Sequence, residues 1–324
     1  MQVVTSPESS VDGMSAPFCL AVIIPAYNEQ ESIERAINGV RAITPKIEAL
    51  GGALKIIVIN DGSSDDTGSR AIKAGADHVL THHANRGLGA SVCRGLAEAV
   101  LINANIAVKL DADLQHDPSD IPGIIAPILR DEADIVFGNR YTRIDYKMPL
   151  VRRWGNHFFN WTMSRLTGWN VVDGQPGLFA VSKAYLSVFY LPGNYNYAQQ
   201  ILLDARYNDM RFTQVDVTFR QRAYGTSFVS LKYPFMAIYQ ILVIIATYAP
   251  LRVFGVLGIG ALAVAALVVF AEMVIFFAGI TERPVDHPNL VLGLLFLGWQ
   301  GLLFCILAEL TRRRERMNID GRQR

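Results

Sequence analysis

The sequence has few cysteines, no secretory leader and no surplus of charge of either sign. Cys19, Cys93 and Cys305 lie far apart, and no two of them form a Cys-x-x-Cys motif. This spacing argues against disulfides and against a cysteine zinc site, and it favours reduced thiols in a reducing compartment. Because 30 basic side chains are balanced by 29 acidic ones, the chain has no basic field that would attract nucleic acid.

The first 17 residues lack the basic and apolar regions of a signal peptide, and their polar, Ser-rich composition predicts a disordered tail over residues 1–17. Apolar residues nevertheless make up 51% of the whole chain. That fraction is high for one soluble domain and suits a globular domain followed by membrane spans. We therefore expect a catalytic domain over residues 18–232 and a membrane part after it.

Long apolar runs lie near the carboxyl end. Residues 254–280 contain one charge, Glu272, and residues 290–308 contain none. At about 1.5 Å per residue each run can cross a hydrocarbon core of roughly 30 Å, so we predict two transmembrane helices within residues 250–310. Glu272 would be costly against lipid, so we expect it near the membrane interface or facing a partner helix.

The flanks of these runs predict how the chain sits in the membrane. Residues 233–249 are apolar but too short to span, so we expect an interfacial helix there. The tail at 311–324 begins with a basic cluster at 312–314, which should remain cytoplasmic. Two spans then put the catalytic domain on the same cytoplasmic side. The sequence leaves the oligomeric state open, a homo-oligomer included.

Short apolar runs that alternate with helical patterns organise the first part of the chain. We predict strands at residues 20–24, 55–59, 78–80, 106–110, 135–137 and 215–219, and helices that end near 43 and 102 or cover 195–204. This alternation predicts an α/β fold with a doubly wound, mainly parallel sheet. Asn28 and Glu31 fit a capping box for the first helix, and Ser63 and Asp66 can cap the next one.

The stretch on which the prediction of function depends follows the fourth strand. Asp111 and Asp113 are spaced i, i+2, which aims both carboxylates the same way if the strand continues, and Gln115 adds an amide oxygen with the same parity. Oxygen ligands without cysteine or clustered histidine suit Mg²⁺ or Mn²⁺. Asp at a strand end is also a common turn residue, so this stretch alone leaves a metal site and a turn as alternatives.

Other polar residues follow the neighbouring strands. Tyr27 and Glu29 come after the first strand and Asp61 after the second, where a carboxylate can accept a hydrogen bond from a base or a ribose hydroxyl. Gly87 and Gly89 lack the third glycine and the spacing of a dinucleotide fingerprint, which excludes a Rossmann NAD site. These turns supply no Walker lysine, nucleophile elbow or Cys/His pair, so P-loop, hydrolase and thiol chemistry are not expected.

Residues 140–170 combine aromatic and basic side chains. The basic ones are Arg140, Arg143, Lys147, Arg152, Arg153 and Arg165, and the aromatic ones include Trp154, Phe158, Phe159, Trp161 and Trp169. A solvated amphipathic helix is one interpretation, but the apolar runs downstream favour a segment at an anionic membrane surface. Further on, Asp173 lies in a Gly/Pro turn, and Arg222 precedes a glycine turn suited to binding an oxyanion.

Several of these motifs, taken in order, are those of a known family. They are Pro25-Ala26-Tyr27-Asn28-Glu29, Asn60-Asp61-Gly62-Ser63, Asp111-Ala112-Asp113-Leu114-Gln115, Gly138-Asn139-Arg140 and Arg222-Ala223-Tyr224-Gly225-Thr226-Ser227. The ordered set resembles family 2 glycosyltransferases, and most of all the dolichyl- or polyprenyl-phosphate mannose and glucose synthases. The resemblance covers residues 19–324 once the two carboxy-terminal spans are included.

The resemblance implies a GT-A fold, a nucleotide-sugar donor such as GDP-mannose or UDP-glucose, a divalent cation (Mg²⁺ or Mn²⁺) and a polyprenyl or dolichyl phosphate acceptor. The residues that it assigns to the nucleoside are Pro25, Tyr27, Glu29 and Asp61. Those that it assigns to nucleotide and metal contacts are Asp111, Ala112 and Asp113, with Asp113 and Gln115 as the metal ligands. The phosphate-binding arginines that it implies are Arg140 and Arg222.

Two departures from the family pattern concern basic residues. Phe228 stands where the family often has lysine, so Lys232 or an arginine is expected to substitute. The family's Gly-Phe-Arg turn is Gly177-Leu178-Phe179 here, so an arginine contact is lost. These departures leave open which sugar and which acceptor are used.

The expected reaction is a single in-line displacement that inverts the anomeric carbon, with Asp111 and Asp113 at its centre. A phosphate monoester is largely dianionic at neutral pH, so this acceptor needs no general base. Arg153 and Arg222 are the candidates for holding the acceptor phosphate, and Asp173 is a lesser candidate for orienting the sugar.

Two alternatives to this reaction remain. A processive polysaccharide synthase would use a hydroxyl acceptor, and its Gln-x-x-Arg-Trp motif does not follow Gln199 or Gln200. A non-catalytic membrane adaptor would use the sheet for binding alone, which the full set of carboxylates and arginines argues against.

Overall fold

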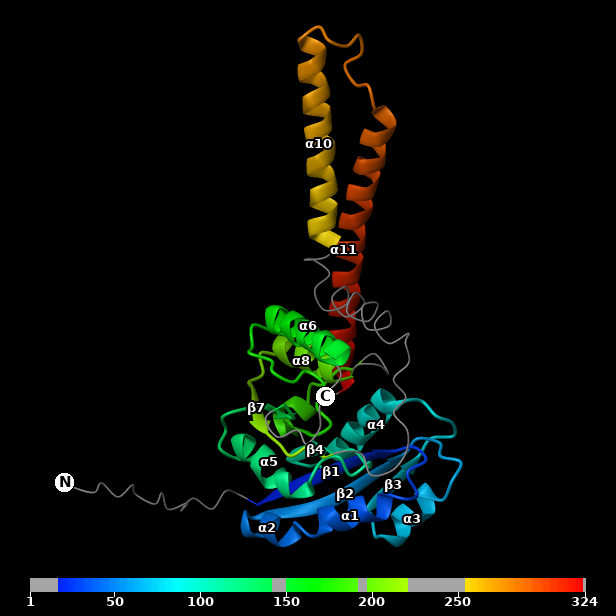
Figure 1. Ribbon diagram of the computed structural model, residues 1–324, viewed down its shortest axis with the longest axis vertical. Helices are drawn as coiled ribbons and strands as arrows, with labels where there is room; N and C mark the ends of the chain where they lie inside the picture. The colour runs from blue at the N-terminus through cyan, green and yellow to red at the C-terminus, as the bar shows by residue number, and fades with distance from the viewer. Residues whose placement is uncertain (1–16, 142–149, 192–196, 221–253, 323–324) are drawn as a thin grey trace, which may run out of the picture. The chain divides into compact units, whose positions relative to one another are not determined.

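The computed structural model describes residues 17–141, 150–191, 197–220 and 254–322. By its internal contacts the chain divides into two units, Met1–Val229 and Ser230–Arg324. The first contains an α/β domain and the second a pair of long helices (Figure 1). The predicted interfacial helix at 233–249 and all but the last residue of the predicted tail at 1–17 lie outside the described residues.

The α/β domain is built on one seven-stranded sheet. The strands are β1 (Phe18–Ala26), β2 (Gly52–Asn60), β3 (His78–Thr81), β4 (Ile106–Lys109), β5 (Ile135–Asn139), β6 (Phe179–Ser182) and β7 (Phe212–Asp216). Their order is β3-β2-β1-β4-β6-β5-β7, and only the pairings of β6 with β4 and β5 are antiparallel in the described sheet. The mainly parallel sheet is confirmed, although the sequence patterns omit β6.

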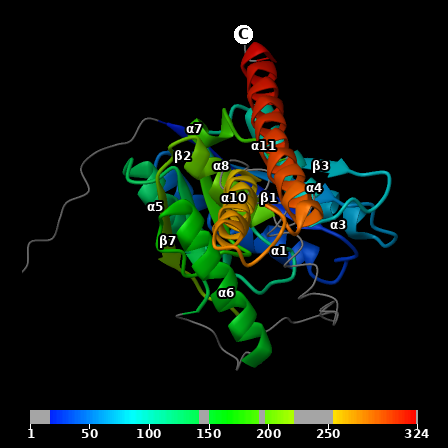
Figure 2. The same ribbon diagram turned by 90° about the horizontal axis from the view of Figure 1, so that it is seen from above.

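Helices cover both faces of the sheet and give three layers. The helices are α1 (Ile33–Arg41), α2 (Thr44–Ala49), α3 (Thr67–Lys73), α4 (Leu88–Leu101), α5 (Ile121–Leu129), α6 (Leu150–Thr167), α7 (Lys183–Leu186) and α8 (Tyr197–Tyr207), with a 3₁₀ turn at Pro118–Asp120. α6 and α8 lie side by side (Figures 1 and 2).

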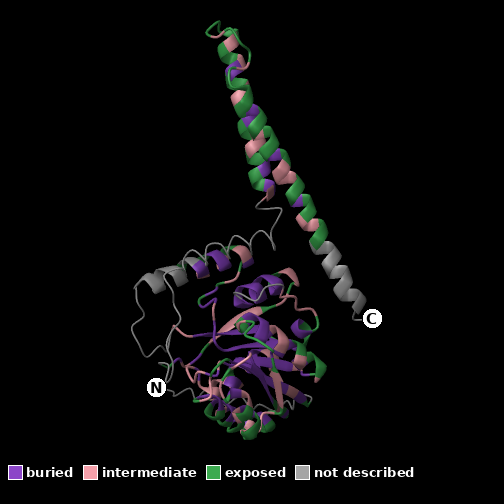
Figure 3. Cartoon of the chain, turned by 90° about the vertical axis from the view of Figure 1, so that its right-hand side faces the viewer, coloured by how far each residue is buried: buried purple, intermediate pink, exposed green. Residues whose placement is uncertain are grey.

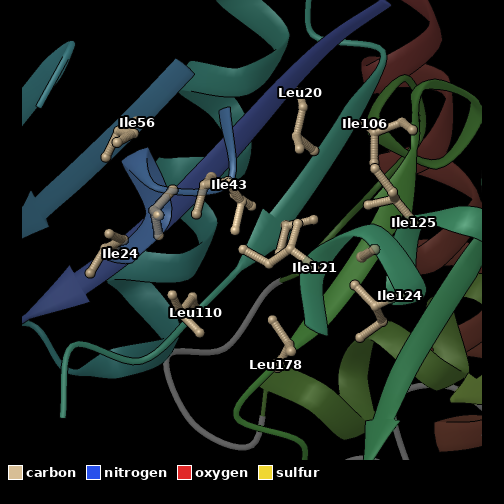
Figure 4. Close-up of a cluster of buried hydrophobic side chains, with 14 of the residues drawn as sticks. Leu20, Ile24, Ile43, Ile56, Ile106, Leu110, Ile121, Ile124, Ile125 and Leu178 are labelled. Carbon is tan, nitrogen blue, oxygen red and sulfur yellow. The ribbon is translucent and has the colours of Figure 1, made fainter. Parts of the chain in front are cut away.

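Alternation along β1 explains how the two faces become buried. Leu20, Val22 and Ile24 belong to one apolar cluster that includes residues of α1 and α5 (Figure 4). Ile23 points to the opposite face, where it meets Gly95 of α4. Both faces of a parallel sheet are covered in this way, which accounts for the nearly continuous apolar run in the sequence of this strand.

The last strand begins three residues before the predicted strand at 215–219. β7 pairs with β5 from Ile135 and Phe212 onward, and the Phe212 ring packs edge-on against Phe137. The apolar residues that follow leave the sheet, and Phe219 forms a single antiparallel bridge with His116. The apolar pattern correctly indicated that Val217 and Phe219 are buried, but it assigned them to a strand, whereas both follow β7.

The predicted capping box is wrong. Helix α1 begins at Ile33 with Ser32 as its N-cap, and Asn28 has a left-handed backbone (φ 54°) that precedes the helix. Asn28 Oδ1 instead accepts hydrogen bonds from the backbone N–H (3.0 Å) and hydroxyl (3.4 Å) of Ser64. For the next helix, Asp65 rather than Ser63 or Asp66 accepts from the N–H of Thr67 (3.0 Å). These short polar side chains serve contacts between loops, which sequence spacing does not reveal.

The second unit contains two helices that are long and apolar enough to cross a membrane. They are α10 (Val256–Phe277) and α11 (Pro288–Arg322), and the apolar windows are Val256–Phe277 and Pro288–Thr311. Only 11% of each window is buried, unlike the core helix of a soluble protein (Figure 3). A Cβ on Gly258 would lie 2.9 Å from the carbonyl oxygen of Gly298, so glycine permits the two backbones to approach closely.

Glu272 on α10 has partners at the end of this helical pair. Its carboxylate accepts hydrogen bonds from the N–H of Asp286 (3.1 Å) and from Nδ1 of His287 (2.8 Å). Both partners lie just before α11, so the one acidic residue of the first apolar run faces the connection to the second. A carboxylate that is hydrogen-bonded in this way avoids the cost of exposure to lipid.

Candidate active site

The polar residues singled out in the sequence gather at one edge of the sheet, called here the rim. β1, β2, β4 and β5 run in the same direction, so their carboxyl ends meet at this edge. Because β6 runs the other way, the turn at 173–178 that precedes it reaches the same edge. In open α/β sheets the ligand site lies outside the carboxyl ends of the strands.

The loops after β1 and β2 are joined by hydrogen bonds. The N–H of Asn28 donates to Ser63 Oγ (3.0 Å), and the N–H of Glu29 donates to Thr67 Oγ1 (2.9 Å). Glu29 Oε2 accepts from the hydroxyl of Ser32 (2.7 Å). Pro25 is buried at the end of β1, whereas Tyr27 remains 46% exposed. The result is a fixed loop pair that presents an aromatic ring to solvent.

Asp61, at the tip of β2, lies in a closed socket. It is 4% exposed, and its Oδ1 accepts hydrogen bonds from Nδ1 of His82 (2.6 Å) and the N–H of Arg86 (2.9 Å). Its Oδ2 accepts from the N–H of Gly87 (2.8 Å). Gly87 has φ 90°, a left-handed backbone that a side chain would strain. The carboxylate therefore organises the loop that leads into α4.

β4 ends before Asp111 and Asp113, although the prediction that both carboxylates point the same way required the strand to continue through them. β4 stops at Lys109, and residues 112–113 form a turn in which Asp113 Oδ1 accepts from the N–H of Gln115 (3.1 Å). The alternation argument for a shared direction of Asp111 and Asp113 is therefore wrong. Leu114 has a left-handed backbone (φ 63°), which is uncommon for a bulky residue and is typical of strain at functional sites.

The segment after β7 runs along this turn. The N–H of Arg220 donates to the carbonyl of Gln115 (2.8 Å), and Nε2 of Gln115 donates to the carbonyl of Arg220 (3.2 Å). The guanidinium of Arg220 pairs with Asp117. Oε1 of Gln115 accepts no hydrogen bond from the part of the chain that the structure describes. The amide of Gln115 is thus held by its nitrogen end, and its oxygen is available to a ligand.

These residues fit a divalent cation only if a phosphorylated ligand supplies the remaining ligands of the ion. Across the described residues, no group of three or more His, Cys, Asp or Glu side chains is placed to hold a metal ion. Asp113 and Gln115 offer two kinds of oxygen donor at one turn. Mg²⁺ is usually bound by one or two carboxylates together with substrate phosphates and water, so this donor set suits an ion that arrives with a phosphorylated ligand.

Lys109 is the last residue of β4 and is completely buried (0% exposed). Its Nζ donates to Asp111 Oδ1 (2.5 Å) and to the carbonyl of Gly177 (3.1 Å), and it lies 5.5 Å from the ring centre of Tyr197. Burial acts to lower the pKa of Lys109, but Asp111 and Tyr197 outweigh it and raise that pKa above its ordinary value. The ammonium is therefore charged. In the sheet, Lys109 stands opposite Phe179.

His116 lies beside the same carboxylate. It is 3% exposed, and neither ring nitrogen has a hydrogen-bond partner within the described chain. Burial lowers the pKa of His116 to about 4. A Cβ on Gly177 would clash with Nε2 of His116 and would lie 2.6 Å from Asp111 Oδ2, so only glycine fits between them.

Arg140 and Asp173 form a bidentate ion pair. Nε and an Nη of Arg140 donate to the two carboxylate oxygens of Asp173, at 2.7 and 3.0 Å. Asp173 is completely buried, and the guanidinium of Arg140 is 5.2 Å from the ring centre of Phe219. Burial works against the charge of Arg140, but Asp173 raises the pKa of Arg140 above its ordinary value. The predicted phosphate-binding arginine and the predicted sugar-orienting acid are thus held by each other.

Some of the predicted site residues lie outside the part of the chain that the structure describes. Arg222, Phe228 and Lys232 lie outside the described residues, and of Arg153 only the backbone, within α6, is described. Ala112 is buried at 3%. Sequence reasoning missed Lys109 and His116, although a lysine inside an apolar strand run was a visible signal for the first.

The sequence of the α/β domain matches a known family model. Residues 21–189, more than half of the chain, match the model of glycosyl transferase family 2. The chain belongs to glycosyl transferase family 2. This membership confirms the family that the motifs indicated.

Relatives with curated descriptions match in sequence as well. An uncharacterized protein of Methanocaldococcus jannaschii is 35% identical over 163 residues, which are 50% of this chain and 63% of that protein. The UDP-N-acetylglucosamine–dolichyl-phosphate N-acetylglucosaminyltransferase of Methanococcus voltae is 30% identical over 217 residues, 60% of this chain and 83% of the relative. The undecaprenyl-phosphate 4-deoxy-4-formamido-L-arabinose transferase of Salmonella paratyphi B is 32% identical over 248 residues, 74% of this chain and 71% of the relative. The chain thus spans less than two thirds of the first relative and more of the other two.

Solved structures confirm the fold of this family 2 glycosyltransferase as GT-A. Glucosyl-3-phosphoglycerate synthase from Mycobacterium tuberculosis, in complex with Mn²⁺, UDP and glucosyl-3-phosphoglycerate, has a TM-score of 0.56 at 20% identity, covering 76% of this chain and 86% of that one. The complex of that synthase with Mn²⁺, UDP-glucose and glycerol 3-phosphate has a TM-score of 0.57 at 21% identity, with the same coverage. At these identities the likeness establishes the fold alone.

Proposed function

We propose that this glycosyltransferase transfers a single hexose from a nucleotide sugar to a polyprenyl or dolichyl phosphate, with inversion at the anomeric carbon. The observation that carries the proposal is the rim, where Asp61, Asp113 and Gln115 follow β2 and β4, the two parallel strands on either side of β1. Two of the relatives named above act on dolichyl or undecaprenyl phosphate, and the two apolar helices suit an acceptor that resides in a membrane.

The socket around Asp61 favours a uridine over a guanosine donor. A carboxylate has about four lone-pair positions, two on each oxygen. In Asp61, two protein donors occupy both positions on Oδ1, and a third occupies one of the two positions on Oδ2. One position remains, which matches the single N–H of a uracil edge. Guanine presents two adjacent N–H groups that pair best with both oxygens of a carboxylate. We therefore infer UDP-sugar rather than GDP-mannose as the donor, with the exposed Tyr27 beside the base and Pro25 and Glu29 framing the nucleoside.

The leaving nucleoside diphosphate needs its growing negative charge neutralised. A divalent cation held by Asp113 and Gln115 would supply that charge, as Mg²⁺ or Mn²⁺. Oε1 of Gln115 suits this role because Arg220 occupies only the nitrogen end of the amide. Asp111 and Ala112 complete the contact to the nucleotide, and Arg140 lies at the same rim.

The acceptor phosphate is assigned to Arg153 and Arg222, since each belongs to a basic stretch of the sequence. Because a phosphate monoester is already an anion at neutral pH, the protein needs to orient it rather than deprotonate it. Asp173 holds Arg140 in an ion pair at the rim, and we assign this pair to orienting the sugar. Orientation by fixed charges is worth most where water is excluded.

The orientation in the membrane forms part of the proposal. The basic residues at 312–314 follow the second apolar window directly, and such residues are retained on the cytoplasmic side. Two spans then put the catalytic unit on that side too. Labelling of single cysteines placed at residues 285 and 318 in intact cells tests this, and labelling of residue 318 from outside the cell would contradict it.

The decisive experiment offers the purified protein a panel of labelled donors and acceptors. UDP-glucose, UDP-N-acetylglucosamine and GDP-mannose are each incubated with undecaprenyl or dolichyl phosphate, with Mg²⁺ or with a chelator. We expect one sugar per lipid in the organic extract, from a uridine donor, and none with the chelator. A polymer would instead identify a processive synthase, and no turnover with any pair would identify a binding protein.

A further inference from the structure

We propose that Arg220 is a positioning residue for Gln115, which it holds so that the amide oxygen of Gln115 stays available to the cation. The inference rests on the proposed function in one respect, that Gln115 is a ligand of that cation. It assigns a role to residues 217–220, which follow β7 and are called here the strap. Three observations carry it: the strap pairs with the chain after β4, it holds one end of the Gln115 amide, and an ion pair with Asp117 fixes its last residue.

The strap is joined to the chain after β4 on both sides of Phe219. Before it, the N–H of Thr218 donates to Asp120 Oδ2 (2.7 Å). After it, the N–H of Arg220 donates to the carbonyl of Gln115 (2.8 Å). Phe219 itself is 6% exposed, so its ring anchors the strap in the interior of the domain. The position of the Arg220 main chain is therefore set by the fold before any ligand binds.

The side chain of Gln115 is held at one end. Its Nε2 donates to the carbonyl of Arg220 (3.2 Å), and its Oε1 accepts no hydrogen bond from the described residues. An amide has a donor end and an acceptor end, and a cation binds only the acceptor end. A carbonyl that holds the nitrogen therefore selects the orientation in which the oxygen is available. Since glutamine loses much rotamer freedom when it is ordered, ordering it in advance raises the affinity for the cation.

The guanidinium of Arg220 keeps this carbonyl in place. It pairs with Oδ2 of Asp117, while Oδ1 of Asp117 accepts from the N–H of Ser119 (2.9 Å) at the 3₁₀ turn. The Asp117 carboxylate thus ties the strap to the same stretch of chain that carries Gln115. Because the side chain of Arg220 is 58% exposed, the ion pair is a weak one and its loss should have a small, measurable effect.

The test measures the affinity for Mn²⁺, by electron paramagnetic resonance, of the full-length protein in detergent at saturating UDP or GDP, whichever the protein binds. Arg220→Gln breaks the ion pair and should weaken Mn²⁺ binding by about threefold, because an exposed pair is worth a factor of about five at most. If Arg220 acted on the ion only through its charge, the loss of a cation near the site would tighten Mn²⁺ binding instead. Asp117→Asn keeps an oxygen for Ser119 and should weaken binding by a similar factor.

A double-mutant cycle separates positioning from direct contact and from damage. Gln115→Ala alone should weaken Mn²⁺ binding by about tenfold or more. Arg220→Gln added to Gln115→Ala should cause no further loss, because no amide is left to position. A further threefold loss in the double variant would show that Arg220 contacts the ligand itself or that its replacement damages the site.

Two control variants accompany the cycle. Arg220→Lys keeps a cation that can pair with Asp117, so its Mn²⁺ affinity should stay within about twofold of wild type. Arg130→Gln removes an arginine of similar exposure, which pairs with Glu132 beyond the end of α5, and should leave Mn²⁺ binding unchanged. Thermal melting establishes that each variant is folded.

The proposal is overturned if folded Arg220→Gln binds Mn²⁺ as tightly as wild type or more tightly, or if its loss persists in the Gln115→Ala background. Both results leave the proposed function standing as long as Gln115→Ala itself binds Mn²⁺ weakly. If Gln115→Ala binds Mn²⁺ as wild type does, or if wild type binds none, the cation assignment and this inference fail together. If wild type transfers no sugar from any donor, the transferase assignment fails, whereas the Mn²⁺ titration still decides the role of Arg220.

Discussion

The tips of β2 and β4 hold the two acidic parts of the rim, and they are built in opposite ways. At β2, both carboxylate oxygens of Asp61 accept hydrogen bonds from the surrounding protein. At β4, Asp113 and Gln115 lie in a turn with a left-handed residue between them, and Gln115 keeps an amide oxygen available. The Asp61 carboxylate already accepts three hydrogen bonds before a ligand binds, whereas the turn at the β4 tip keeps the amide oxygen of Gln115 for its ligand.

In the proposed reaction, the β2 tip recognises the base and the β4 tip takes part in the chemistry. A socket with one acceptor position left can discriminate between bases, because a wrong base leaves its polar groups unpaired. A turn that keeps the amide oxygen of Gln115 available can instead respond, through a bound cation, to the charge that develops on a leaving group. If this division is right, damage to the two tips should produce different kinds of defect.

The largest effect is expected at the β4 tip. Asp113→Ala removes the carboxylate proposed to hold the cation, so kcat for sugar transfer should fall by about 10³-fold or more, which is about 4 kcal/mol of transition-state stabilisation. Asp209→Ala, an exposed acid whose recorded partner is Arg206, is the matched control and should retain full activity. Turnover of Asp113→Ala near the wild-type rate would refute the ligand role.

A smaller and different effect is expected at the β2 tip. Asp61→Asn turns one acceptor of the socket into a donor that faces protein N–H groups, which should lower the free energy of unfolding by about 1–3 kcal/mol. The KM for the donor should rise about tenfold while kcat changes little, since one good hydrogen bond is worth about that factor. Steady-state kinetics and thermal melting measure both.

Asp134 provides the control for the β2 tip. It is buried, and its carboxylate accepts from Arg211 far from the rim, so Asp134→Asn should lose stability without a change in KM. A rise in KM for Asp134→Asn as large as that for Asp61→Asn would show that the kinetic defect comes from lost stability rather than from the base.

The strained residue at the β4 tip should give a still smaller change. Leu114→Gly relieves a left-handed backbone, so it should raise the free energy of unfolding by about 1 kcal/mol. The looser turn should lower kcat by a few fold. Asp209→Gly, at another left-handed position (φ 52°), should gain similar stability and keep its activity. Equal activity of the two variants would separate the strain from function.

The smallest effect concerns pH and the loops after β1 and β2. Burial alone would raise the pKa of Asp65, but hydrogen bonds from Thr67 and Gln30 outweigh it and lower that pKa. A lowered pKa means that Asp65 stabilises the fold above the unfolded value of about 4 and that this contribution is lost as the pH falls through the folded value. Because the group is partly exposed, we expect less than about 1 kcal/mol.

Melting temperatures at about pH 6 and about pH 3.5 measure this contribution. Asp65→Asn should show a smaller difference between the two than wild type, because its amide does not titrate. Asp66→Asn, the neighbouring exposed acid, serves as the control and should match wild type. An Asp65→Asn variant with the full wild-type pH dependence would assign the effect to other groups.

The sequence predicted the frame of the domain well because its strands are short apolar runs between helical patterns. β1, β2, β3, β4 and β5 were all indicated by such runs, and the apolar runs of α10 and α11 by their length. The sequence did not indicate β6, since Phe179–Ser182 is too short to show a period. It also misassigned Asn28, whose partners lie in the loop after β2.

The candidate site was predicted as a set of residue types but not as a set of contacts. The motif placed Asp111 and Asp113 in equivalent roles, whereas in the structure Lys109 binds the first and a turn holds the second. Arg140 and Asp173 appeared as two separate candidates and form one ion pair. Contacts between residues tens of positions apart depend on strand order, which the pattern of a single strand does not contain.

β6 runs against its neighbours, and this reversal affects how the enzyme can diversify. The chain leaves the sheet at the end of β5 and returns at the start of β6, and these adjacent strands pair Phe137 with Phe179. The excursion between them therefore has both ends at the rim, closed at its base by Arg140 and Asp173. Doubling the length of a flexible loop costs only about 0.6 kcal/mol of closure entropy, so this segment can be replaced by a longer or shorter one at little cost in stability. If this segment binds the acceptor, as proposed for Arg153, its exchange would change the acceptor while the donor site at β1, β2 and β4 stays the same.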